Sequence, residues 1–262
     1  MRLLCCLLLL NFSVIAQELT TGVSGTGLGK GVFSFRTLNS FKNYQINSDK
    51  YTHYHQINTF ALGINSRLTL MGHLPFHTTS GSKDYDARIR LGDPLVMAKL
   101  RILQLDSDTI NTTRLSLLIA AELPSTDAEI SSNSLDPVVG FGLTTIQGRH
   151  GINLACKAKI NTGNTPYYEF SKDDYLETVL GYSWRLTPST WDDYTHVSTY
   201  FFTEFIHNSD YSSEQSLTVS PGYLIEARDF AIEIALHLPL MDQGSTHNRL
   251  DFGMTIGIRY LF

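Results

Sequence analysis

The sequence predicts an all-β fold, a transmembrane antiparallel β-barrel of about twelve strands. Three observations lead to this prediction. Runs of alternating apolar and polar residues recur along the chain, and such alternation is typical of β-strands. Most runs are long enough for a tilted membrane strand of ~9–11 residues. The connections tend to alternate between short and long. No stretch after the N-terminus approaches the ~20 apolar residues of a spanning helix, so this chain could cross a membrane only as a closed barrel.

The N-terminus predicts export. Arg2 is followed by the apolar stretch LLCCLLLLNFSVI and then by Ala16, the pattern of a secretory signal peptide that spans residues 1–16. The alternative, a lipoprotein anchored through Cys5 or Cys6, lacks an apolar stretch before the cysteine. The formal net charge of −5 excludes the basic footprint of a nucleic-acid-binding protein.

Residues 17–30, QELTTGVSGTGLGK, are polar and rich in glycine. They are expected to form either a flexible leader before the barrel or a small plug in its lumen. The stretch GTGLGKG resembles a phosphate-binding loop. However, Gly31 occupies the place where such loops need Ser or Thr, and a predicted strand follows instead of a helix. Nucleotide binding is therefore not favoured.

The barrel is predicted to span residues 31–262, and each strand is assigned from its alternation. The predicted strands are 31–39, 55–64, 67–77, 93–103, 113–123, 137–146, 151–161, 174–184, 196–206, 215–226, 229–240 and 250–262. Tight turns near residues 65–67, 148–150 and 227–228 are expected at the periplasmic end, and long connections at the external end. The 104–112 and 185–195 connections are longer than this pattern predicts.

The two faces of each predicted strand differ. In 229–240 one row is entirely apolar and the other is small or polar, with few charges. A soluble β-sandwich would also alternate, but its polar rows would be more highly charged and its strands shorter. The last strand is predicted to turn Leu250 and every second residue to Phe262 toward lipid, and Asp251, Thr255 and Arg259 toward the lumen. A charge at Ile256 should then abolish assembly, whereas the same charge at Thr255 should be tolerated.

Several stretches, taken in order, resemble one family. The stretches are INSRLTLMGHLPF, RLGDPLVMAKLRI, DPVVGFGLTTIQGRHGINLACKAKINTG and LTVSPGYLIEARDFAIEIALHLPL, followed by the terminal strand. The chain resembles the outer-membrane barrel transporters of the "MetA-pathway of phenol degradation" family over nearly all of its exported length. The resemblance implies an outer-membrane channel for aromatic or other small hydrophobic compounds. One departure is Pro94, directly after Gly92-Asp93, which indicates a strand start or a bulge.

Charged residues on the inner rows are the first candidate site. The predicted lumen-lining residues are Arg36, Lys99, Arg101, Glu122, Lys157, Lys159, Glu177, Glu204, Glu233 and Arg259. Buried charges must be paired or hydrated. They would therefore form either a selectivity-setting ladder along a pore or a network that fills a narrow barrel and holds it shut.

Three histidines form a second candidate site. A three-residue turn at 65–67 places His55 opposite His77 near the external mouth, with His53 further out on the same face. Paired imidazoles can bind zinc, nickel or copper, and the alternative is a set of polar mouth residues without a ligand. The acidic stretches KDYD at 83–86 and DSD at 106–108 are candidate calcium ligands, although solvated loops are the commoner explanation.

The favoured function is facilitated diffusion of small molecules through an outer-membrane channel of a Gram-negative bacterium. The alternative is a closed structural or adhesion barrel whose external loops bind a partner. An enzyme is not expected, because His196, Ser198 and His237 do not form a recognisable nucleophile, base and orienting group. No cofactor is expected. The expected partners are membrane lipid, a small solute and the assembly machinery that recognises the terminal strand, and the oligomeric state is not predicted.

Overall fold

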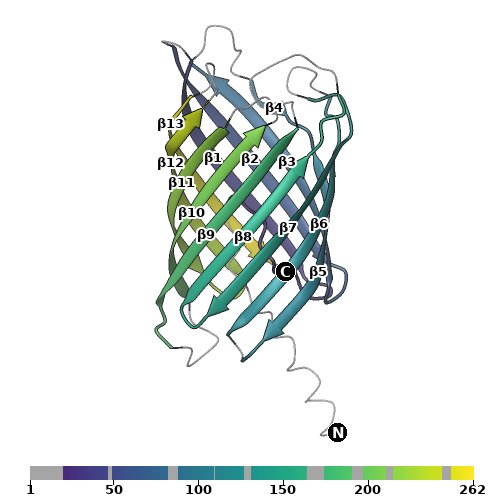
Figure 1. Ribbon diagram of the computed structural model, residues 1–262, viewed down its shortest axis with the longest axis vertical. Coiled ribbons are helices and arrows are strands. Elements are labelled where there is room, and N and C mark those ends of the chain that lie inside the picture. Colours follow the sequence, from purple (N-terminus) through teal and green to yellow (C-terminus); the bar gives the residue numbers. More distant parts are fainter. Residues whose placement is uncertain are drawn as a thin grey trace, which may run out of the picture.

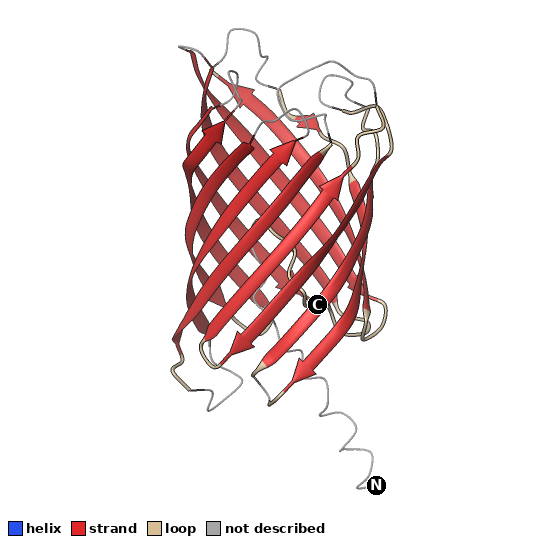
Figure 2. Ribbon diagram, viewed as in Figure 1, coloured by secondary structure: helices blue, strands red, loops and turns tan. Residues whose placement is uncertain are grey.

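The computed structural model describes residues 20–46, 49–81, 88–108, 110–126, 131–163, 174–190, 197–210, 215–243 and 249–262. The predicted signal peptide lies outside these residues, as does the start of the Gly-rich stretch. The described chain is all β (Figures 1 and 2). No helix in these ranges combines the length and hydropathy of a membrane span.

Twelve long strands form a closed antiparallel barrel, as predicted. They are β1 (Phe33–Ile46), β2 (Asp49–Gly63), β3 (Leu68–Ser80), β5 (Leu95–Asp106), β6 (Thr112–Glu122), β7 (Asp136–Gln147), β8 (His150–Lys159), β9 (Tyr175–Thr187), β10 (Ser198–Asp210), β11 (Gln215–Glu226), β12 (Phe230–Gln243) and β13 (Arg249–Leu261). Each pairs with its neighbours in sequence, and β1 pairs with β13 to close the barrel. A short strand, β4 (Arg90–Leu91), pairs with the outer part of β3.

The first hairpin differs from its prediction. The strand expected at 31–39 continues to Ile46, and the next begins at Asp49 rather than at residue 55. The two arms stay in register as far as Ile46↔Asp49. Polar and aromatic residues are mixed here, so this part lacks the regular alternation that marks a half-buried strand. Main-chain pairing and ring pairs across the hairpin, Phe41 with Tyr54 and Tyr44 with Tyr51, form these strand ends without that signal.

Two other departures concern connections. The predicted 104–112 connection shrinks, because β5 continues to Asp106 and β6 starts at Thr112. Pro94 lies just before β5, in agreement with the prediction of a strand start there. The connection between β9 and β10 remains long. We call the end of the barrel with the β7–β8 and β11–β12 turns the turn end, and the opposite end the loop end.

The two rows of each strand have opposite environments. Along β12, Ala231, Glu233, Ala235 and His237 are buried, whereas the apolar residues between them are exposed. In β13, Thr255 is 3% exposed and Ile256 is 37% exposed. An apolar outer row and a small or polar inner row are what a barrel in lipid requires.

The terminal strand closes the barrel at the turn end. The amide of Phe262 donates to the Phe33 carbonyl at 2.8 Å, and the two rings lie 5.5 Å apart. Exposed aromatic side chains gather on neighbouring strands at this end, including Tyr182, Trp184, Tyr223, Tyr260 and Phe262. Such a band is typical of the interface between lipid and water.

Candidate functional site: the lumen and the segment that crosses it

Residues 20–32 form what we call the N-terminal segment, of which residues 20–28 lie inside the barrel. The segment joins β1 at the turn end, where the Gly31 amide donates to the Gly63 carbonyl at 2.8 Å and the Gly63 amide donates to the Val32 carbonyl at 3.0 Å. From there it passes into the lumen, where Figure 2 shows it as a loop between the strands. The sequence left two alternatives for this stretch, a flexible leader and a small lumen plug.

Inner side chains from several strands bind the main chain of the segment. On β3, β6 and β7, hydroxyls of three residues contact it. The Thr69 hydroxyl accepts from the Leu28 amide at 3.0 Å, and the Thr144 hydroxyl accepts from the Gly25 amide at 2.9 Å. The Ser116 hydroxyl donates to the Gly25 carbonyl at 2.7 Å. Gly25 is thus bound through both of its main-chain polar groups.

Two charged residues bind the rest of the segment. The Lys99 ammonium on β5 donates to the Ser24 carbonyl at 3.3 Å. The two carboxylate oxygens of Glu204 on β10 accept from the amides of Thr20 and Thr21 at 2.6 and 3.2 Å. Lys99 is 2% exposed and Glu204 is 1% exposed, so the segment covers both charges. The bonds from the Lys99 ammonium to a carbonyl and from two amides to the Glu204 carboxylate are charge-assisted. Such hydrogen bonds are stronger than those between neutral groups.

Two glycines allow the segment to approach the wall closely. A β-carbon on Gly25 would lie 2.2 Å from the Arg114 carbonyl oxygen, and one on Gly142 of β7 would lie 2.4 Å from the Val23 carbonyl oxygen. The atoms in the way are main-chain atoms of the wall and of the segment, which cannot rotate aside. Close contact between main chains is a common reason for glycine.

Six of the ten predicted lumen residues pair with one another. Arg36 binds Glu233 at 2.7 Å, Lys157 binds Glu177 at 2.8 Å, and Lys159 binds Glu122 at 3.1 Å. The first pair reaches across β13, where Gly257 leaves room: a β-carbon there would lie 2.4 Å from a Glu233 carboxylate oxygen.

The other four predicted residues have different partners. Lys99 and Glu204 bind the N-terminal segment, as described above. Arg101 donates to the Ser66 carbonyl in the β2–β3 turn. Arg259 pairs with Glu226 at 2.5 Å, a residue that sequence reasoning missed. Alternation along 215–226 could have found it, because Glu226 shares the inner row of Leu224 and Ser220.

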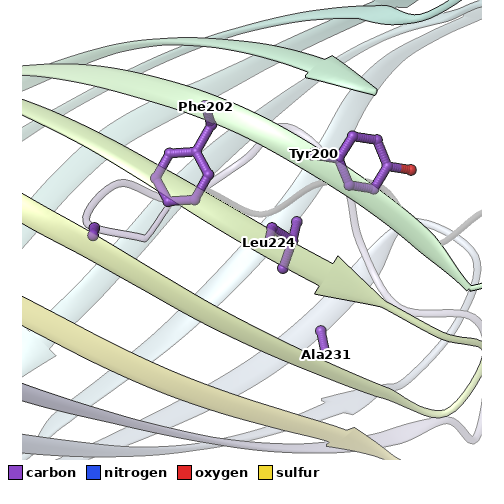
Figure 3. Close-up of a cluster of buried hydrophobic side chains, with 5 residues drawn as sticks. Tyr200, Phe202, Leu224 and Ala231 are labelled. Carbon is purple, nitrogen blue, oxygen red and sulfur yellow. The ribbon is translucent and has the colours of Figure 1, made fainter. Parts of the chain in front are cut away.

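Apolar side chains also face the lumen. Tyr200, Phe202, Leu224, Ala231 and Ala235 form one cluster on β10, β11 and β12 (Figure 3). A second cluster on β5, β6 and β7 contains Met97, Leu118, Ala120 and Val138, and Val23 of the N-terminal segment packs against it. The inner wall is therefore a mixture of ion pairs, hydroxyls and apolar patches. Sequence reasoning did not single out the apolar patches.

The three histidines at the mouth do come together. His55 pairs with His77 in the β2–β3 register, and their rings stack at 4.3 Å. One nitrogen of His53 lies 3.3 Å from a nitrogen of His77. No group of three or more potential metal ligands in the described part of the chain is arranged to hold an ion, these histidines included. The described structure therefore does not support a metal site at these histidines.

The calcium candidates divide between two regions. KDYD at 83–86 lies outside the described residues. Asp106 accepts from the Thr112 hydroxyl, and Asp108 accepts from the Asn111 amide at 2.6 Å. These carboxylates organise the β5–β6 turn.

A serine and a histidine meet in the wall, although neither is arranged for catalysis. The Ser220 hydroxyl lies 2.7 Å from Nδ1 of His237, and Nε2 of that ring lies 2.7 Å from the Thr255 hydroxyl. Ser220 also donates to the Leu236 carbonyl at 2.8 Å and is fully buried. Its proton is thus directed at the main chain, and the third group is a hydroxyl rather than a carboxylate. Of the sequence candidates, Ser198 is also buried, and His196 lies outside the described residues.

Two aspartates connect the loops at the loop end. Asp93 accepts from the amides of Ser125 and Ser132, each at 2.8 Å. Burial raises the pKa of Asp93, but hydrogen bonds from Ser131, Ser132 and Ser125 outweigh burial and hold this pKa below its ordinary value. Asp136, at the start of β7, accepts from the Thr162 amide at 2.8 Å and so connects the β8–β9 loop.

An apolar outer surface, a polar inner wall and complete strand closure together define an outer-membrane β-barrel fold. Comparison with solved structures gives the same fold. The chain is similar to the COG4313 outer membrane channel from Pseudomonas putida F1, with a TM-score of 0.66 and 14% identity over 90% of this chain and 97% of that chain.

Two further solved barrels are less similar. The translocator domain of the autotransporter NalP from Neisseria meningitidis has a TM-score of 0.46 and 11% identity over 90% of each chain. OccK11 from Pseudomonas aeruginosa has a TM-score of 0.40 and 8% identity over 92% of this chain and 99% of that chain. No protein-family model matches the sequence, and no curated protein matches it.

Proposed function

We propose that the protein is an outer-membrane channel for facilitated diffusion of small molecules, and that its N-terminal segment is the plug of the lumen. The observation that carries this proposal is the segment itself. It crosses the lumen without being a strand of the barrel, and the wall binds it only through non-covalent contacts. The neutral hydrogen bonds to Thr144 and Ser116 contribute about 1 kcal/mol each and the charge-assisted bonds to Lys99 and Glu204 about 1.5–3 kcal/mol each. None of these bonds belongs to the strand ladder, so the plug can leave while the barrel stays intact.

The lumen residues take the role of setting which solutes pass. The ion pairs formed by Lys157 and Lys159 place alternating charge along the wall, and the two apolar clusters provide surfaces for uncharged parts of a solute. These clusters support aromatic or other small hydrophobic solutes as one substrate class. The protein is not proposed to be an enzyme. Its location would be the outer membrane, reached through the predicted signal peptide and the assembly machinery that selects the terminal strand.

The second candidate function is a closed barrel whose external loops bind a partner. The loop end supports it, because Asp93 and Asp136 hold three connections in one arrangement. A fixed loop surface suits a binding partner, whereas a channel needs a passage through the same loops.

Conductance in planar lipid bilayers separates the two functions. We expect Gly25→Ala to raise single-channel conductance, because the added β-carbon clashes with main-chain oxygens and displaces the plug. Gly29→Ala is the matched control, since its β-carbon would make an ordinary contact of 3.5 Å with Val32. Liposome swelling across solutes from sugars to aromatic compounds then reports the substrate class. A Gly25→Ala barrel that folds but passes neither ions nor solutes would contradict the channel.

A further inference from the structure

The contacts between the N-terminal segment and the wall are directed almost entirely at the main chain. Lys99, Ser116, Thr144 and Glu204 bind carbonyl and amide groups that every peptide carries. Two side chains of the segment also contact the wall. The Thr20 hydroxyl donates to Glu233 at 2.9 Å, and Val23 packs on an apolar cluster. The wall therefore recognises mainly the main chain of a peptide rather than its side chains.

The order of these contacts fixes a direction along the lumen. Carboxylate oxygens of Glu204 accept from two consecutive amides, Lys99 then donates to a carbonyl, and the Thr144 and Ser116 hydroxyls bind both polar groups of the next residue. A chain running the other way would present carbonyls to the carboxylate and amides to the ammonium. Both mismatches place like partial charges together, so only one direction fits.

We infer that this wall is a binding site for short peptides, and that a peptide solute occupies the channel in place of the N-terminal segment. The inference rests on the proposed function, because a solute reaches the site only when the plug leaves. It also predicts a sequence requirement. The residue bound by Thr144 and Ser116 must be glycine, since a β-carbon there would lie 2.2 Å from a carbonyl oxygen of the wall.

The test uses the full chain carrying Gly25→Ala, whose own segment is displaced. The first probe is an acetylated and amidated peptide with the sequence of residues 20–26, TTGVSGT. The second is an unrelated peptide, AAAAAGA, and the third, AAAAAAA, replaces the essential glycine. The fourth is the first peptide with N-methyl groups on its first two amides, which removes the donors to Glu204.

We expect the first two peptides to bind with similar affinity, measured by fluorescence anisotropy in detergent and by block of the conductance. The glycine-free and N-methylated peptides should bind at least about tenfold more weakly, because each loses a close contact or charge-assisted bonds. Adding Glu204→Gln to the variant should weaken binding of the first peptide by a similar factor and should leave the affinity of the N-methylated peptide unchanged.

Three results would overturn the inference. The first is equal binding of the N-methylated peptide, and the second is binding of TTGVSGT without binding of AAAAAGA. The third is displacement of bound peptide by sucrose or phenol at the concentrations at which peptides compete. Anisotropy does not depend on ion flow, so a variant that binds peptides but never conducts would refute the channel and leave the peptide site intact.

Discussion

Two regions of the inner wall handle buried charge in different ways. Toward the loop end, Lys157, Lys159, Glu122 and Glu177 neutralise one another within the barrel. Around the N-terminal segment, Lys99 and Glu204 bind the main chain of a segment that is not part of the barrel. The ion pairs of the first region form once the strands have closed. The hydrogen bonds of the second region form only when the N-terminal segment lies in the lumen. The first kind of wall forms a lining by itself, and the second accords with the plug proposed above.

The largest expected effect is a difference in stability between a variant of the first region and a variant of the second. Lys157→Met removes the partner of Glu177 and should destabilise the barrel by about 3 kcal/mol, the cost of leaving a buried charge unpaired. Lys99→Met should cost less, about 1–2 kcal/mol, because it removes a hydrogen bond to the neutral Ser24 carbonyl and leaves no unpaired charge at that contact. The temperature at which the folded band disappears on an unboiled gel measures both. If the two variants are equally unstable, the distinction between the regions is wrong.

The next effect comes from a glycine of the wall that contacts the N-terminal segment. Gly142→Ala would place a β-carbon 2.4 Å from the Val23 carbonyl oxygen and should raise conductance severalfold without changing the strands. Gly72→Ala is the control, because no atom lies within 4 Å of its added carbon. Single-channel recording of both variants makes the comparison. Unchanged conductance in Gly142→Ala would mean that the segment does not restrict the passage.

A further test concerns which face of the closing strand meets lipid. Ile256→Glu should prevent assembly, since a charge on the lipid face is destabilising, most of all near the membrane midplane. Thr255→Glu should still yield folded barrel, because Thr255 is buried in the wall beside His237 and Ser40. The fraction of folded protein in outer-membrane extracts is the measurement. Equal yields would overturn the assignment of faces.

The smallest effect is a pH dependence at the loop end. The lowered pKa of Asp93 means that its carboxylate stabilises the loops fully above the ordinary value of 3.8, and that this stability is lost as the pH falls through the lowered value. Amide exchange at Ser125 and Ser132 should therefore accelerate below about pH 4. In Asp93→Asn, exchange at these amides should be fast already at neutral pH and should change little on acidification beyond the intrinsic rate.

Much of the fold could be predicted from the sequence. Alternation located all twelve long strands, because one row must meet lipid and the other must not. It failed for residues 40–46 and 49–54, where aromatic and polar residues do not alternate regularly and pairing across the hairpin extends both strands. It also gave no sign of β4, a two-residue strand too short to show a period. The pairing of His55 with His77 followed from the turn length, but the stacking of their rings did not.

The candidate site could be predicted only in part. The inner rows identified which charged residues would point inward, but not which would pair. Lys157 and Glu177 are register partners on adjacent strands, whereas Arg36 reaches Glu233 across β13 only because Gly257 has no side chain there. The apolar clusters were missed because their members are separated in sequence and are brought together by strand stagger.

The sequence by itself determined the class of fold, the face of each strand and the strand that closes the barrel, because these depend on a local period of two residues. Tertiary structure alone decided that residues 20–28 occupy the lumen. That segment has no period, and its partners Lys99, Thr144 and Glu204 come from strands far apart in sequence. Their side chains converge on one main chain only after the barrel has closed around it.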